Sequence, residues 1–151
     1  MNLSQIGDRI PNFYDRAIDL EDLDFSQINP KKAITIIKHR IAIKKTIEIL
    51  EAKMQDLPTL AELGSLSGLS RTYFSQVFKE TTGMKLQEYI TEVRFKKAEN
   101  LLSNIDLKIK EVAYETGFKD PNYFCRTFKR KMGLNPTNWR VKKLIKSGNR
   151  N

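Results

Sequence analysis

One pattern of residues occurs twice in this chain, and the two copies lie about fifty positions apart. The first copy spans 60–83 and the second spans 109–133. Each copy indicates a short helix, a turn that contains glycine, a polar capping residue and a second helix that ends at another glycine. The matched positions are Leu60, Leu63, Gly68, Tyr73, Phe74, Phe78, Lys79 and Gly83 in one copy and Ile109, Val112, Gly117, Tyr123, Phe124, Phe128, Lys129 and Gly133 in the other. The chain therefore has to accommodate the same helix-turn-helix unit twice.

The positive charge of the chain lies after residue 29. The formal net charge is +9 at pH 7, from 27 basic and 18 acidic residues. Residues 1–29 contain two basic and six acidic side chains, a net charge of −4, so residues 30–151 carry the remaining +13. A charge of that sign and size indicates an anionic partner, with nucleic acid ahead of a membrane surface.

Residue counts exclude several kinds of site. A single cysteine, Cys125, and a single histidine, His39, cannot form a disulfide framework or a cysteine-rich zinc site. The same shortage argues against a DNA-repair or alkyl-transfer enzyme with a cysteine-ligated zinc. No run approaches eighteen apolar residues, and the first residues lack the basic and apolar regions of a secretion signal. We expect a cytoplasmic, non-enzymatic protein without metal or cofactor.

The periodicity of apolar residues predicts an all-α fold with about seven helices and no strand. Asn29 and Pro30 mark the start of a helix that runs to about residue 54. The expected helices that follow cover 59–66, 71–82, 85–103, 108–116, 121–132 and 137–146. The chain then divides into an acidic segment at 1–29, a basic helical domain at 30–146 and a tail at 147–151.

The first long helix is apolar on two faces. One face, predicted to be core, contains Ile36, Ile43, Ile47, Leu50 and Met54, and the other contains Ile34, Ile37 and Ile41. We expect part of residues 10–28 to cover the second face, because this segment offers Phe13, Ile18, Leu23 and Phe25. The alternatives are a second copy of the chain on that face, which would give a dimer through the N-terminal region, and a disordered acidic tail.

Small and polar residues fit the needs of a helix-turn-helix. Gly64 and Ala113 occupy the position where two helices cross closely, and Gly68 and Gly117 suit a turn with positive φ. Ser70 and Asp120 can cap the second helices. The apolar face of each second helix is expected to be buried, and its members are Tyr73, Phe74, Val77 and Phe78 in the first copy and Tyr123, Phe124 and Phe128 in the second.

The remaining side chains of the second helices are expected to face double-stranded DNA. The expected base contacts are Arg71, Thr72, Ser75 and Gln76 in the first copy and Pro121, Asn122, Cys125 and Arg126 in the second. Gln76 and Asn122 can pair with adenine, and Arg126 with guanine. The expected phosphate contacts are Lys79, Lys129, Arg130, Lys131 and Arg140. Cys125 is expected to be a small contact residue, with redox sensing as the alternative.

The length of the joining helix agrees with binding of two grooves by one molecule. A helix of about 17–19 residues spans roughly 26–29 Å at 1.5 Å per residue. Successive major grooves on one side of B-DNA are about 34 Å apart. A monomer could therefore place its two recognition helices in adjacent grooves and contact an asymmetric site of about two turns.

Residues 117–136, followed by Trp139 and Arg140, closely resemble the signature of the AraC/XylS family of bacterial transcription regulators. Residues 94–102 also look like that family's linker helix, and the resemblance extends over about 31–143. It implies a bilobal, homeodomain-like domain of seven helices and transcriptional control, usually activation through contact with RNA polymerase. It also implies base contacts at the positions of Thr72, Ser75, Gln76, Pro121, Asn122, Cys125 and Arg126.

The chain departs from that family in three respects. Pro121 lacks a backbone N–H, which costs little in the first turn of a helix. Gly64 stands where alanine is common, so the first helix of the motif is expected to be less rigid. Residues 1–29 are too short for the sensor domain that most members carry. The chain is therefore either a stand-alone regulator located at the nucleoid or the DNA-binding part of a larger one. A basic protein-interaction module without specific DNA binding is the remaining alternative.

Overall fold

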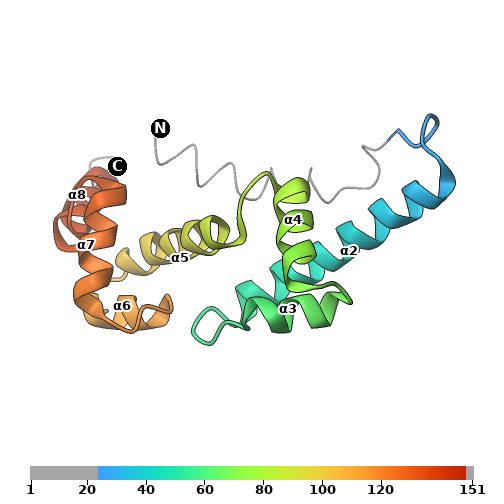
Figure 1. Ribbon diagram of the computed structural model, residues 1–151. Helices are drawn as coiled ribbons and strands as arrows, with labels where there is room; N and C mark the ends of the chain where they lie inside the picture. Colours follow the sequence, from blue (N-terminus) through green and yellow to red (C-terminus); the bar gives the residue numbers. More distant parts are fainter. Residues whose placement is uncertain (1–23, 149–151) are drawn as a thin grey trace. The chain divides into compact units, whose positions relative to one another are not determined.

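The computed structural model describes residues 24–148, and all regular structure in this range is α-helical (Figure 1). The helices are α2 (Pro30–Ala52), α3 (Leu60–Ser67), α4 (Arg71–Thr82), α5 (Leu86–Leu102), α6 (Ile109–Glu115), α7 (Pro121–Met132) and α8 (Pro136–Gly148). The predicted all-α fold is confirmed. The predicted limits of α4 and α7 agree with the structure, whereas α2 ends at Ala52, two residues before the predicted end.

The described residues form two compact units, and each unit contains one copy of the repeat. The first unit consists of residues up to 53 together with 57–90, and the second consists of 54–56 together with the residues from 91 onward. Helix α5 begins in the first unit and continues in the second. In the first unit α2 contacts α3 and α4, and in the second α7 contacts α6 and α8.

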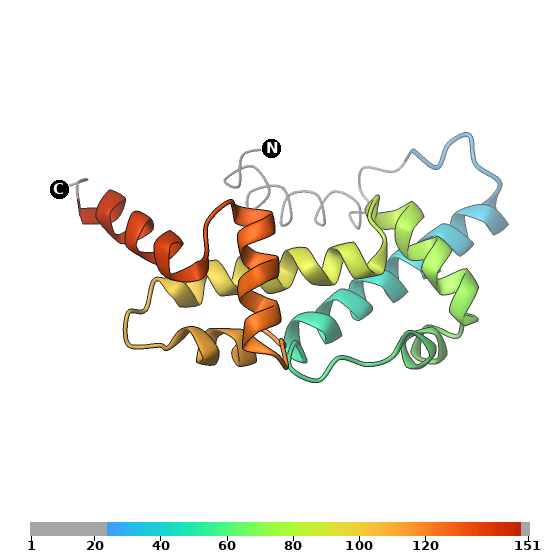
Figure 2. The ribbon, with the colours of Figure 1, turned by 60° about the vertical axis from the view of Figure 1, so that its left-hand side comes forward.

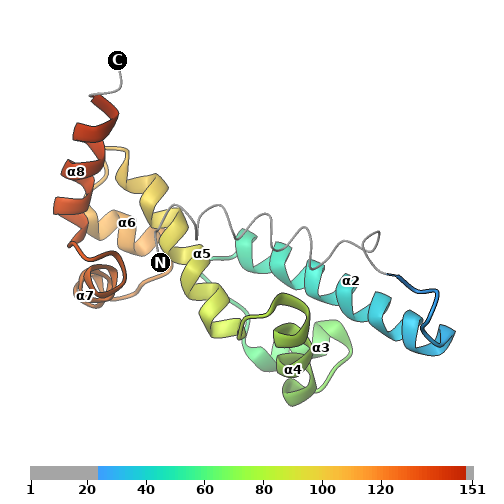
Figure 3. The ribbon, with the colours of Figure 1, turned by 90° about the horizontal axis from the view of Figure 1, so that it is seen from above.

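The core of the first unit lies between the C-terminal half of α2 and the two helices of its motif (Figure 3). Ile43 and Leu50 of α2 are completely buried, as are Phe74 and Phe78 of α4. The ring of Phe78 lies 5.7 Å from that of Tyr89, which brings the start of α5 into the same core. Ile43, Ile47 and Leu50 of α2 are four and three residues apart, and Phe74 and Phe78 of α4 are four residues apart, so each helix buries one face.

Aromatic rings form much of the core of the second unit, whose helices Figure 2 shows in sequence from α5 to α8. Phe95 is central, because its ring centroid lies 5.7 Å from that of Phe118, 6.5 Å from Phe124 and 5.9 Å from Phe128. Helical periodicity over 85–103 predicts a buried stripe that includes Val93 and not Phe95, but Val93 is only half-buried and Phe95 is 2% exposed. Phe95 is buried because the rings of Phe118, Phe124 and Phe128 pack around it, and periodicity along α5 does not include these contacts.

The N-terminal half of α2 extends beyond α3 and α4 (Figures 1 and 3). Within the part of the chain that the structure describes, its second apolar face is partly exposed. Ile34 is 53% exposed and Ile41 is 45% exposed, whereas Ile37 is half-buried. Ile36, predicted to be core, is also only half-buried. The segment predicted to cover this face lies mostly outside the described residues, so its packing stays a prediction.

Candidate nucleic-acid interface

Local capping contacts set the start of each helix in the first motif. The Thr59 hydroxyl accepts a hydrogen bond from the Glu62 backbone N–H at 3.2 Å, and the Glu62 carboxylate accepts one from the Thr59 N–H at 2.7 Å. At α4 the Ser70 hydroxyl accepts from the Tyr73 N–H at 3.2 Å. This confirms the capping role predicted for Ser70. Each contact satisfies a backbone donor that the helix itself cannot pair.

Two glycines determine the turn of the first motif. Gly68 has φ of +70°, as predicted, and ends α3 in the left-handed conformation. A Cβ on Gly64 would lie 2.9 Å from the backbone oxygen of Leu69. Even a methyl group would therefore push the turn away from α3. The close approach of the turn therefore explains why this chain has glycine at position 64, where the family commonly has alanine.

Helix α4 separates a buried face from a polar one. Its buried residues are Phe74, Val77, Phe78 and Thr82. The residues predicted to contact DNA lie on the other face: Arg71, Thr72, Gln76 and Lys79 are exposed, and Ser75 is half-buried. The Gln76 side-chain amide donates to the Glu80 carboxylate at 3.0 Å. This contact was not predicted, and it orients the amide at the surface.

The turn of the second motif is packed more tightly than that of the first. Gly117 has φ of +88°, and a Cβ there would lie 2.3 Å from the Met54 backbone oxygen and 3.2 Å from the Arg94 Nε. Arg94 lies with its guanidinium 5.6 Å from the Phe118 ring, and partial burial lowers its pKa. The turn therefore has no room for any side chain at Gly117.

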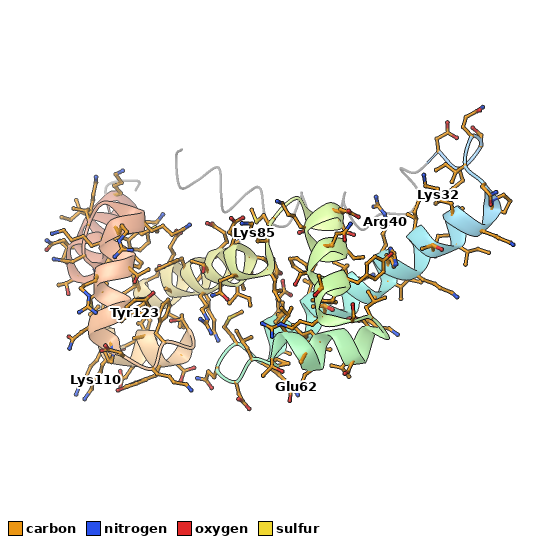
Figure 4. All side chains as sticks on the ribbon, in the orientation of Figure 1. Lys32, Arg40, Glu62, Lys85, Lys110 and Tyr123 are labelled. Atoms are coloured by element: carbon orange, nitrogen blue, oxygen red, sulfur yellow. The ribbon has the colours of Figure 1, made fainter. Side chains whose placement is uncertain are left out.

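Helix α7 repeats the arrangement of α4 with more positive charge. The Asp120 carboxylate caps it by accepting from the Asn122 N–H at 2.9 Å, as predicted. Phe124, Phe128 and Met132 are buried. Among the predicted DNA contacts, Asn122, Arg126, Lys129 and Arg130 are exposed, and Pro121, Cys125 and Lys131 are half-buried. Figure 4 shows the side chains of this unit around α7.

Burial raises the pKa of the Cys125 thiol. A raised pKa keeps the sulfur protonated at neutral pH, and the thiol form is a poor nucleophile. A raised pKa differs from the lowered pKa typical of redox-sensing cysteines, and the contact role of Cys125 stays a prediction.

The prediction that Tyr73 and Tyr123 are buried is wrong. Tyr73 is 41% exposed and Tyr123 is 52% exposed. Each tyrosine precedes a completely buried phenylalanine in the first turn of its helix, and that phenylalanine occupies the core. The tyrosine ring then lies at the edge of the core, against His39 in the first unit and Phe118 in the second.

Two predicted phosphate contacts have partners inside the second unit. Lys131 forms an ion pair with Glu92 of α5. Arg140 donates from Nε to the Leu102 carbonyl at 2.9 Å and from Nη2 to the Leu107 carbonyl at 2.7 Å. These contacts join α7 and α8 to α5 and were not visible in the sequence. A phosphate contact by either side chain stays a prediction.

The two motifs differ in charge. Helices α3 and α4, with their turn, contain two basic and two acidic residues, whereas 109–132 contains six basic and three acidic residues. The second motif therefore has a net charge of +3 and the first is neutral.

Among residues 24–148 no group of histidine, cysteine and carboxylate side chains is placed to hold a metal ion. No helix in that range is long and apolar enough to cross a membrane.

Comparison with known proteins identifies relatives of this arrangement. A family model described as a helix-turn-helix domain matches residues 63–142. The chain is 39% identical over 85 residues to the HTH-type transcriptional activator Btr of Bacillus subtilis, a match that covers 56% of this chain and 16% of that protein. The chain spans less than half the length of the curated relatives it matches.

Solved structures show the same fold. The C-terminal domain of the response regulator yesN from Fusobacterium nucleatum has 35% identity and a TM-score of 0.61, with 66% of this chain and 98% of that chain covered. The DNA-binding domain of AdpA, solved in complex with a target DNA, has 25% identity and a TM-score of 0.62, with 70% and 95% covered.

Proposed function

This chain belongs to the AraC/XylS family of helix-turn-helix transcription regulators, and we propose that it binds specific sites on double-stranded DNA with α4 and α7 as its recognition helices. One observation supports this most directly. Both helices are capped at the N-terminus, buried on one face and polar on the other, at matching positions of the repeat. The structurally similar AdpA domain was solved with DNA bound.

The proposed base contacts follow from the exposed N-terminal parts of these helices. Arg71, Thr72, Ser75 and Gln76 would act in the first motif, and Pro121, Asn122, Cys125 and Arg126 in the second. Lys79, Lys129 and Arg130 are exposed further along and would bind phosphates. Because the second motif carries the larger positive charge, we propose that it supplies more of the sequence-independent affinity.

We also propose that the chain works in the cytoplasm and activates transcription through contact with RNA polymerase. The similarity to a protein named as a transcriptional activator supports this role. A monomer with two motifs could occupy two major grooves without a partner subunit. A basic protein-interaction module would share the charge, but it would not need two capped helices with polar faces.

Measurement of binding at several salt concentrations tests the proposed function. Contact with six or more phosphates predicts a slope of about −5 or steeper in a plot of log affinity against log salt concentration. A random-sequence duplex and a duplex selected by the purified chain should both show this dependence, with tighter binding to the selected duplex. A salt-independent affinity would refute DNA binding, and equal affinity for both duplexes would refute sequence specificity.

A further inference from the structure

Two tyrosines outside the cores occupy the same position in both motifs. Tyr73 is the third residue of α4, and Tyr123 is the third residue of α7. They are 41% and 52% exposed, whereas the phenylalanine after each one is 0% exposed. Packing at the edge of the core covers only about half of each tyrosine, so its recurrence in both copies indicates a role for the exposed part.

Each tyrosine ring is supported on one side. The Tyr73 ring meets the edge of the His39 imidazole at a centroid distance of 5.4 Å, and its hydroxyl oxygen lies 3.4 Å from His39 Nε2. The Tyr123 ring lies 6.3 Å from that of Phe118. These contacts restrict the orientation of each ring before any ligand binds. If His39 carries its proton on Nε2, the imidazole donates to the phenol oxygen, and the phenol hydrogen stays available to another acceptor.

The tyrosines border the residues proposed to contact bases. Tyr73 precedes Gln76 by three positions, and Tyr123 precedes Arg126 by three positions, so each pair is adjacent on its helix surface. Figure 4 shows Tyr123 on α7. A phenol at this position is suited to donate to a phosphate oxygen.

We propose that Tyr73 and Tyr123 donate hydrogen bonds to DNA phosphates and fix how each recognition helix enters its groove, with His39 as the positioning residue for Tyr73. This inference rests on the proposed DNA binding. A phenol carries no charge, so its contact positions the helix without releasing a counterion. The tyrosines therefore contribute affinity that does not depend on sequence and adds nothing to the salt slope.

Replacement by phenylalanine removes only the hydroxyl and tests the proposal. The unchanged chain and its Tyr73→Phe and Tyr123→Phe variants are titrated with a random-sequence duplex and with the duplex that the chain selects. We expect each variant to bind both duplexes about 5-fold more weakly, with an unchanged salt slope. The matched control is Tyr114→Phe, because Tyr114 is 51% exposed but lies on α6, and it should bind as the unchanged chain does.

Duplexes with one neutral methylphosphonate at a time locate the contact. The unchanged chain should lose affinity at a phosphate to which the Tyr73→Phe variant is insensitive, and Tyr123→Phe should show the same effect at a different phosphate. A His39→Ala change should weaken binding, with no further loss when it is combined with Tyr73→Phe. Unchanged affinity of both phenylalanine variants, or identical methylphosphonate profiles, would overturn the inference and leave the proposed function intact. Failure of the unchanged chain to bind any duplex would refute both.

Discussion

At the scale of single residues, specificity and affinity are expected to depend on different side chains of α7. Arg126→Ala should cost about 1–3 kcal/mol on the selected duplex and relax the base preference at one position, because a bidentate contact to guanine is lost. The control is Lys129→Ala, which should weaken binding to all duplexes alike. Titration of each variant with the selected duplex and with a random duplex measures its loss of affinity on each. Equal losses on the two duplexes for Arg126→Ala would identify Arg126 as a phosphate contact.

Replacement of Gly117 should disturb the turn of the second motif. Gly117→Ala places a methyl group against the Met54 backbone oxygen at a residue with φ of +88°, so we expect a loss of about 1–3 kcal/mol in the free energy of unfolding. Gly133→Ala is the matched control, because Gly133 has φ of +82° but nothing within 4 Å of the added atom. Urea unfolding measures the loss in the free energy of unfolding for both variants. A similar loss in the two variants would mean that the close approach to Met54 does not matter.

At the scale of helices, the polar caps should stabilise the recognition helices. Ser70→Ala removes the acceptor for the Tyr73 N–H and should cost about 1 kcal/mol of stability, and Asp120→Ala should cost a similar amount. Ser65→Ala is the control, because Ser65 is exposed in α3 and alanine favours a helix. Urea unfolding should show no loss for that variant. If Ser70→Ala were equally harmless, the hydroxyl would not stabilise α4.

At the scale of the whole molecule, we expect part of residues 10–28 to cover the apolar face of α2 that contains Ile34, Ile37 and Ile41. Deletion of residues 1–28 should lower stability and promote self-association, because Ile34 and Ile41 are already about half exposed without a described partner. Removal of the net charge of −4 on residues 1–29 should also strengthen DNA binding. Light scattering, urea unfolding and a DNA titration measure the three effects.

The isoleucines themselves provide the control for this deletion. Replacement of Ile34 and Ile41 by serine in the shortened chain should abolish self-association. If the deletion leaves mass, solubility and stability unchanged, residues 1–28 do not cover this face, and the segment is a tail.

The helices and their turns could be predicted from the amino-acid sequence, because these features depend on local contacts. Ser70 and Asp120 cap helices within three residues of themselves, and Gly68 and Gly117 adopt the positive φ that their turns require. The repeat also determined which faces of α4 and α7 are polar. Each of these properties follows from residues one or two turns apart, so periodicity is sufficient to predict it.

Side chains whose partners lie far away in the sequence could be identified only from the packing of the folded chain. Phe95 lies at the centre of the core of the second unit. Lys131 and Arg140 contact residues on or near α5 that are more than thirty positions away in the sequence. Tyr73 and Tyr123 were left exposed because the adjacent phenylalanines filled the cores. Helical periodicity gives the direction of a side chain from its helix, but burial and pairing depend on what packs against that helix.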